Sequence, residues 1–166
     1  MVPIKKGQEI TATYTLTLAG TMYRQRHLHD SKYFKCMCTR CQDPTELGSH
    51  FSTILCQKCP SGLVTSSKST DICADWKCDS CGQVLGSKEV EEVIDTLEKE
   101  VSMLPLERDV YEEKLKSYAK MLHENHHIMV DLKFTLVQVR KMLVGFTRNF
   151  SSLAGNTVLI VAQFLF

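Results

Sequence analysis

The hydrophobic pattern of the chain changes near residue 86, from short irregular stretches to long helical periodicity. Residues 7–18 alternate apolar side chains with threonines, and this period of two predicts a half-buried strand whose partner strands lie elsewhere. A short helix is predicted over residues 20–31. Residues 36–86 are dense in Gly, Ser, Asp and Cys and show little periodicity. They can bury little apolar area, so we expect bound metal to stabilise them.

From Ser87 onward, apolar residues recur at helical spacing and predict three antiparallel helices on short connections, as in a bundle or a tetratricopeptide-like repeat. Ser87 is a candidate N-cap, and Pro105 ends the first helix or begins the second. Glu112 and Lys116 are spaced for an ion pair. The apolar positions of the three helices are Val90, Val93, Ile94, Leu97, Val101 and Leu104; Tyr111, Leu115, Tyr118 and Leu122; and Ile128, Leu132, Leu136, Val139 and Leu143.

The last stretch departs from the helical pattern. Ser, Asn and Gly precede an uncharged, β-prone decapeptide at residues 157–166, which is an aggregation hazard if exposed. It is either a strand that packs into the core or a tail unrelated to the helices. The predicted fold class is therefore α+β, with segments at 1–30, 31–86, 87–143 and 144–166.

Two CxxC pairs carry the strongest chemical signal. Cys56 and Cys59 form one pair, Cys78 and Cys81 the other, and 18 residues separate them. Two such turns can present four thiolates to one tetrahedral zinc ion. The alternative is a disulfide framework. We expect reduced, metal-bound thiols instead, because no signal-peptide pattern precedes the cysteines.

Composition narrows the function classes. The net charge is +1, which gives no electrostatic basis for general nucleic-acid binding. A zinc-ribbon nucleic-acid binder has little support, because the basic residues of 56–81 are opposed by equally many acidic ones. No stretch reaches the roughly 18–20 apolar residues that a membrane-spanning helix needs. Reduced thiols suit the cytosol or the nucleus, and the sequence does not choose between them.

Several motifs resemble one family of enzymes. Gly7-Gln-Glu-Ile-Thr-Ala-Thr-Tyr14, Arg24 and Leu28, and Tyr33-Phe-Lys-Cys-Met-Cys-Thr-Arg-Cys41 resemble the end of a SET domain and its post-SET cysteine motif. The segment 41–48 and the later CxxC pairs are similar to the arthropod branch of SET-and-MYND (SMYD-type) lysine methyltransferases. Residues 123–133 resemble the helical C-terminal region of that family.

The resemblance implies transfer of a methyl group from S-adenosylmethionine to a protein lysine, and hence a protein substrate or partner. Tyr14 matches the family's active-site tyrosine, and Phe34 matches an aromatic residue that closes the cofactor and lysine pocket. Their alternatives are an ordinary strand aromatic and core packing beside the zinc. Cys36, Cys38 and Cys41 match a post-SET zinc site, whose fourth cysteine in the family comes from an earlier SET segment.

Two hypotheses follow from the sequence. In the first, the chain is a fragment or isoform of a SET-type methyltransferase, inactive alone because the N-terminal SET portion is not in the sequence. In the second, it is a non-enzymatic zinc-binding module that presents a helical surface to a protein. Within the chain, the candidates to complete the Cys36, Cys38 and Cys41 site are Cys73, His27 and His29.

Overall fold

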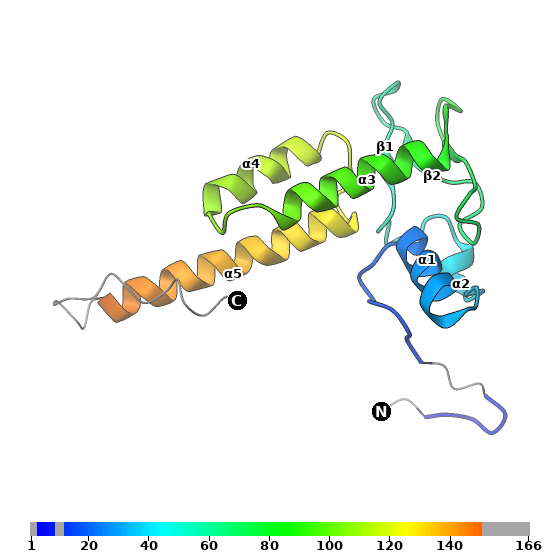
Figure 1. The fold of residues 1–166 in the computed structure, drawn as a ribbon, viewed down its shortest axis with the longest axis horizontal. Coiled ribbons are helices and arrows are strands. Elements are labelled where there is room, and N and C mark those ends of the chain that lie inside the picture. The colour runs from blue at the N-terminus through cyan, green and yellow to red at the C-terminus, as the bar shows by residue number, and fades with distance from the viewer. Residues whose placement is uncertain (1–2, 9–11, 151–166) are drawn as a thin grey trace.

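A computed structural model describes residues 3–8 and 12–150, with side chains described as far as Lys141. It contains helices and one small antiparallel sheet, which confirms the α+β class (Figure 1). The described helices are α1 (Thr21–Lys32), α2 (Thr39–Gln42), α3 (Ser87–Ser102), α4 (Arg108–Tyr118) and α5 (His127–Phe150). The strands are β1 (Ile54–Leu55), β2 (Leu63–Ser66), β3 (Trp76–Cys78) and β4 (Val84–Leu85).

The segment before α1 differs from the prediction. Residues 12–20 contain no strand, and the rest of the predicted strand includes residues 9–11, which lie outside the described residues. Tyr14, Leu16 and Leu18 are 58–69% exposed, and Figure 1 shows this segment running away from the sheet. Alternating apolar residues form a strand only beside a hydrogen-bonding partner. Among the described residues, no strand lies next to this segment.

The four strands form a meander in the order β1-β2-β3-β4, and all neighbouring pairs are antiparallel. The sheet contributes more to the core than the sequence suggested. Val64 is fully buried, Trp76 is 4% exposed, and both belong to one apolar cluster with residues of α3, α4 and α5. Residues 36–86 therefore bury more apolar area than the sequence analysis expected, and this packing stabilises them in addition to any bound metal.

Helices α3, α4 and α5 lie side by side, and each runs antiparallel to the one before it, as predicted (Figure 1). They bury the predicted stripe through residues such as Ile94, Tyr118 and Leu132, whereas Val93 is 44% exposed. The sheet is joined to them directly: the Leu55 amide donates to the Met121 carbonyl at 2.8 Å. The β1–β4 sheet and the three helices thus share one hydrophobic core.

Several local predictions need correction. Gly86, not Ser87, is the N-cap of α3, and Ser87 is the first helical residue. Pro105 lies in the connection between α3 and α4. Glu112 pairs with Arg108 and accepts a hydrogen bond from Arg140 instead of pairing with Lys116, because Arg140 of α5 reaches across the helix pair.

The C-terminal predictions are only partly tested. Helix α5 continues to Phe150, so the predicted boundary at residue 143 falls inside a helix. The decapeptide at 157–166 lies outside the described residues. Among the residues that the structure describes, no helix combines the length and apolarity that crossing a membrane requires.

Candidate metal centres

The two CxxC turns converge on one point between the strands. Cys56 and Cys59 follow β1, Cys78 ends β3, and Cys81 lies in the turn to β4. The Sγ atoms of all four lie within 4.8 Å of one another. The Cys56–Cys81 and Cys59–Cys78 sulfur pairs are 3.6 and 3.7 Å apart. A disulfide needs about 2.05 Å, so these thiols are not bonded to each other.

The spacing fits zinc. A tetrahedron with Zn–S arms of about 2.3 Å has sulfur–sulfur edges of about 3.8 Å, close to both measured pairs. Gly62 supplies a second test of fit. A Cβ built on Gly62 would lie 2.4 Å from Cys78 Sγ and 2.6 Å from Cys59 Sγ. The backbone therefore approaches the sulfur cluster as closely as a glycine allows, which is expected of a closed site with a defined size.

The pKa values of Cys78 and Cys59 are shifted in opposite directions. The Cys81 backbone N–H donates to Cys78 Sγ and, with further hydrogen bonds, lowers the pKa of Cys78 to about 6 against the effect of burial. Burial and hydrogen bonds shared with the other thiols raise the pKa of Cys59 to about 12. Because zinc binds the thiolate form, any thiol protons at this site leave as the ion binds.

A second cluster joins Cys36, Cys38 and Cys41, whose Sγ atoms also lie within 4.8 Å of one another. Helix α1 holds its backbone in place: the Gln25 amide donates to the Cys36 carbonyl at 2.7 Å, and the Cys36 N–H donates back to Gln25 at 3.1 Å. Cys41 is fully buried, and burial raises its pKa to about 12.

None of the three candidates for a fourth ligand joins this cluster. Cys73 is exposed in the connection between β2 and β3. His27 is hydrogen-bonded to Ser31, and His29 is paired with Asp30. His27 is half-buried in the middle of α1 and His29 is exposed nearer its C-terminal end, and neither is grouped with the three sulfurs. The three sulfurs offer three positions of a tetrahedral site, and zinc sites with three protein ligands leave the fourth to water or another group.

The predicted active-site pair does meet in space. The rings of Tyr14 and Phe34 touch edge to face, with centroids 5.8 Å apart and planes at 82°. Phe34 lies two residues before Cys36, so the pair borders the three-cysteine cluster. Tyr14 is 61% and Phe34 40% exposed. Phe34 lines an open hollow together with Tyr33, Lys35 and His29.

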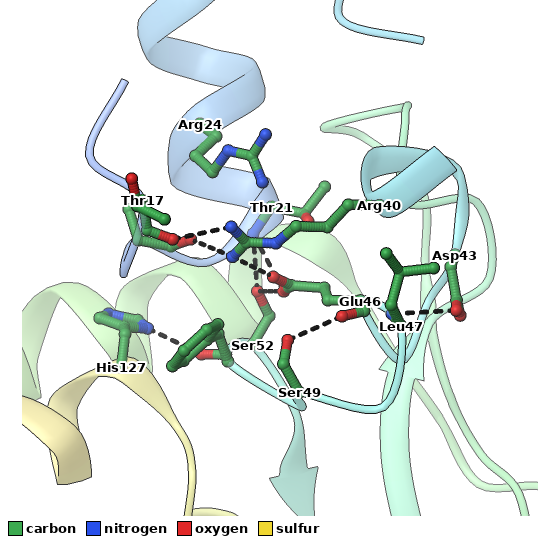
Figure 2. Close-up of polar contacts among 12 residues, drawn as sticks. Thr17, Thr21, Arg24, Arg40, Asp43, Glu46, Leu47, Ser49, Ser52 and His127 are labelled. Carbon is green, nitrogen blue, oxygen red and sulfur yellow. Dashed lines mark hydrogen bonds and ion pairs between the residues drawn. The ribbon is translucent and has the colours of Figure 1, made fainter. Parts of the chain in front are cut away.

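Sequence reasoning missed a buried carboxylate beside the cysteines. Glu46, 2% exposed, accepts hydrogen bonds from the Thr21 N–H at 3.1 Å and the Ser52 hydroxyl at 2.5 Å, and pairs with Arg40 at 2.9 Å (Figure 2). Arg40 also donates to the Thr17 carbonyl at 2.7 Å. The network fastens the loop after α2 to the start of α1.

The signals for this network were present in the sequence but not decisive. Glu46 is the one charged residue between Asp43 and Lys58, and the turn-forming Asp43-Pro44 dipeptide precedes it. In the structure, Glu46 has a φ of +55°, which non-glycine residues rarely adopt. The sequence pattern alone does not show that Glu46, a charged residue in a loop, is buried.

Comparison with known proteins agrees with these features. Over 83 residues, or 49% of its length, the chain is 42% identical to the SET domain-containing protein SmydA-8, isoform A, of Drosophila melanogaster, and 41% identical to isoform B. The chain spans 18% of the length of each relative over this match. No protein-family model and no solved structure matches it. These matches confirm the predicted resemblance to SET-and-MYND proteins, and the cysteine clusters fit the zinc sites it implies.

Proposed function

We propose that this relative of SET-domain SMYD-type proteins forms part of a protein-lysine methyltransferase, to which it contributes the end of the SET active site and its zinc-bound support. The observation that carries the proposal is the contact between Tyr14 and Phe34 beside the three-cysteine cluster. The sequence resemblance assigns these two aromatics to the active site. Their contact in space is an independent property of the fold.

The residues of this chain have separate tasks in such a reaction. S-adenosylmethionine supplies a methyl group on a sulfonium centre when it is bound. The Tyr14 hydroxyl oxygen can accept a hydrogen bond from an N–H of the neutral lysine amine and so orient its free lone pair, while the Phe34 ring restricts the space beside it and excludes water. The Cys36, Cys38 and Cys41 site fixes the backbone that carries Phe34. Zinc here is structural and takes no part in the chemistry.

The proposal is tested by methyl transfer in the longest product of the gene, with radiolabelled S-adenosylmethionine and protein lysine as substrate. Tyr14→Phe should lower kcat by about 10²–10³-fold, comparable to the cost of removing one positioned hydrogen-bonding group from an active site. Tyr23→Phe is the matched control, because Tyr23 is an exposed tyrosine stacked on His27 of α1. Equal activity of the two variants would remove Tyr14 from the reaction.

A second candidate function is a non-enzymatic zinc-binding interaction module with a protein partner. The openness of the hollow beside Phe34 favours it, because methyl transfer needs a narrow, water-excluding channel. Calorimetry of the longest product of the gene with S-adenosylmethionine separates the two. Saturable binding at micromolar concentration supports the enzyme and refutes the purely structural role. We expect either protein in the cytosol or nucleus, where thiols stay reduced.

A further inference from the structure

A small cavity lies where three segments of the chain meet. Its lining comes from the start of α1, from the loop that follows α2 and from the connection between β2 and β3, with Trp76 of β3 on its apolar side. Two lining residues, Thr21 and Ser69, are 3% and 8% exposed. Their hydroxyls are buried and have no protein hydrogen-bond partner among the described residues. An unpaired buried hydroxyl costs free energy, so the cavity calls for a polar occupant.

The size and hydrogen-bonding capacity of the cavity match one water molecule. Its volume is about 20 Å³, and about 10–15 Å³ on the same measure holds one water molecule that has two to four polar partners. Both hydroxyls can donate to the water oxygen. Glu46 also lines the cavity, and its carboxylate accepts three hydrogen bonds, from the Thr21 N–H, the Ser52 hydroxyl and Arg40 (Figure 2). A carboxylate offers about four acceptor positions, so one remains for a water proton.

The charges around the cavity favour a neutral occupant over a cation. Glu46 is paired with Arg40 at 2.9 Å, so its negative charge is already balanced. Asp71, the other acidic residue of the lining, is half-buried, and solvent screens its charge. We propose that the cavity holds one buried water molecule, which accepts hydrogen bonds from the hydroxyls of Thr21 and Ser69 and donates one to the Glu46 carboxylate.

This water molecule fastens the β1–β4 sheet to α1. Hydrogen bonds from the start of α1 reach the loop after α2, but within the described part of the chain none reaches the connection at residues 67–75. That connection leads through β3 to Cys78 of the four-cysteine site, whereas Gln25 of α1 holds the backbone of Cys36. The water therefore joins the supports of the two metal centres. This inference does not depend on methyl transfer.

Urea unfolding of the zinc-loaded chain tests the role of Ser69. With the water in place, Ser69→Ala removes one of its hydrogen bonds and loosens its hold on the Thr21 hydroxyl, so the unfolding constant should rise by about 5–30-fold. An unchanged or lower unfolding constant is the result expected of a hydroxyl without a partner, and it would overturn the proposal. Ser102→Ala is the control and should change the constant by less than about threefold, because Ser102 is exposed and its hydroxyl donates to the Lys99 carbonyl.

A double-mutant cycle shows whether the two hydroxyls share one partner. Neither hydroxyl has a protein partner among the described residues, so coupling between them requires a bridging molecule. In a Thr21→Val background, Ser69→Ala should raise the unfolding constant by about threefold or less. In a Thr96→Val background it should keep its full effect, because the Thr96 hydroxyl lies exposed on α3 and donates to a carbonyl of that helix. Equal effects of Ser69→Ala in the two backgrounds would contradict the bridge.

A crystal structure of the zinc-loaded chain identifies the occupant directly. We expect a water oxygen about 2.7–2.8 Å from both hydroxyls, at the usual length of a hydrogen bond between oxygens. A metal ion at this position, a dry cavity or a direct hydrogen bond between Thr21 and Ser69 would each refute the proposal.

Discussion

Replacing Gly62 by alanine should damage the four-cysteine site without altering any ligand. The added Cβ would lie 2.4 Å from Cys78 Sγ, 2.6 Å from Cys59 Sγ and 3.2 Å from Cys56 Cβ. Real Cβ atoms do not approach sulfur so closely, so the sulfurs or the β1–β2 turn must move. Overpacking costs about 1–3 kcal/mol. Bound zinc would hold the sulfurs in place, so we expect a cost at the upper end of this range, about 3 kcal/mol. This cost corresponds to a loss of about a hundredfold in zinc affinity.

Competition with a chelator of known affinity measures this loss. Gly86→Ala is the matched control, because a Cβ at Gly86 meets nothing within 4 Å. Neither glycine has a positive φ, so the two variants differ in steric contact and not in backbone strain. Wild-type zinc affinity in Gly62→Ala would show that the sulfurs do not close around an ion as their positions indicate.

Three further predictions concern stability. Glu46→Ala should cost about 3 kcal/mol in urea unfolding, because it leaves the Arg40 guanidinium without its carboxylate partner and removes an acceptor from the Thr21 N–H; Asp109→Ala, at an exposed ion pair, should stay within about 0.5 kcal/mol, and equal costs would contradict the network. Burial and neighbouring histidines hold the pKa of His126 well below its ordinary value. The unfolded chain therefore binds a proton below about pH 6.5 that the folded chain refuses, and the melting temperature should fall between pH 7.5 and 5.5. His126→Gln should flatten that fall, and an unchanged slope would show that other groups cause it. Leu132→Ala, at a fully buried position, should cost about 2–5 kcal/mol, against about 0.5 kcal/mol or less for Val137→Ala, which is 47% exposed.

The sequence was informative wherever chemistry or periodicity is local. CxxC spacing alone indicated which sulfurs meet, because each turn brings two thiolates together whatever surrounds it. The helical stripe from Val90 to Leu136 was readable for the same reason, since one face of a helix repeats every 3.6 residues. The edge contact of Tyr14 with Phe34 agrees with the family resemblance, although their catalytic role stays a proposal.

Features that depend on distant contacts could not be predicted in this way. The strand expected over residues 7–18 needs a partner strand, which no pattern within the segment can supply. Glu46 is buried only because Arg40 and the start of α1 converge on it. Gly62 resembles an ordinary turn glycine until the sulfurs of both CxxC pairs are placed around it.

X-ray absorption at the zinc edge tests the central claim most directly, on the Cys36→Ser, Cys38→Ser, Cys41→Ser variant, in which only the four-cysteine site remains. We predict one zinc ion per chain, with four sulfur neighbours at about 2.3 Å. Chelation of that ion should unfold the β1–β4 ribbon, because structural zinc sites contribute on the order of 10 kcal/mol to folding. A metal-free chain that keeps its ribbon, or a shell containing nitrogen or oxygen ligands, would contradict the account.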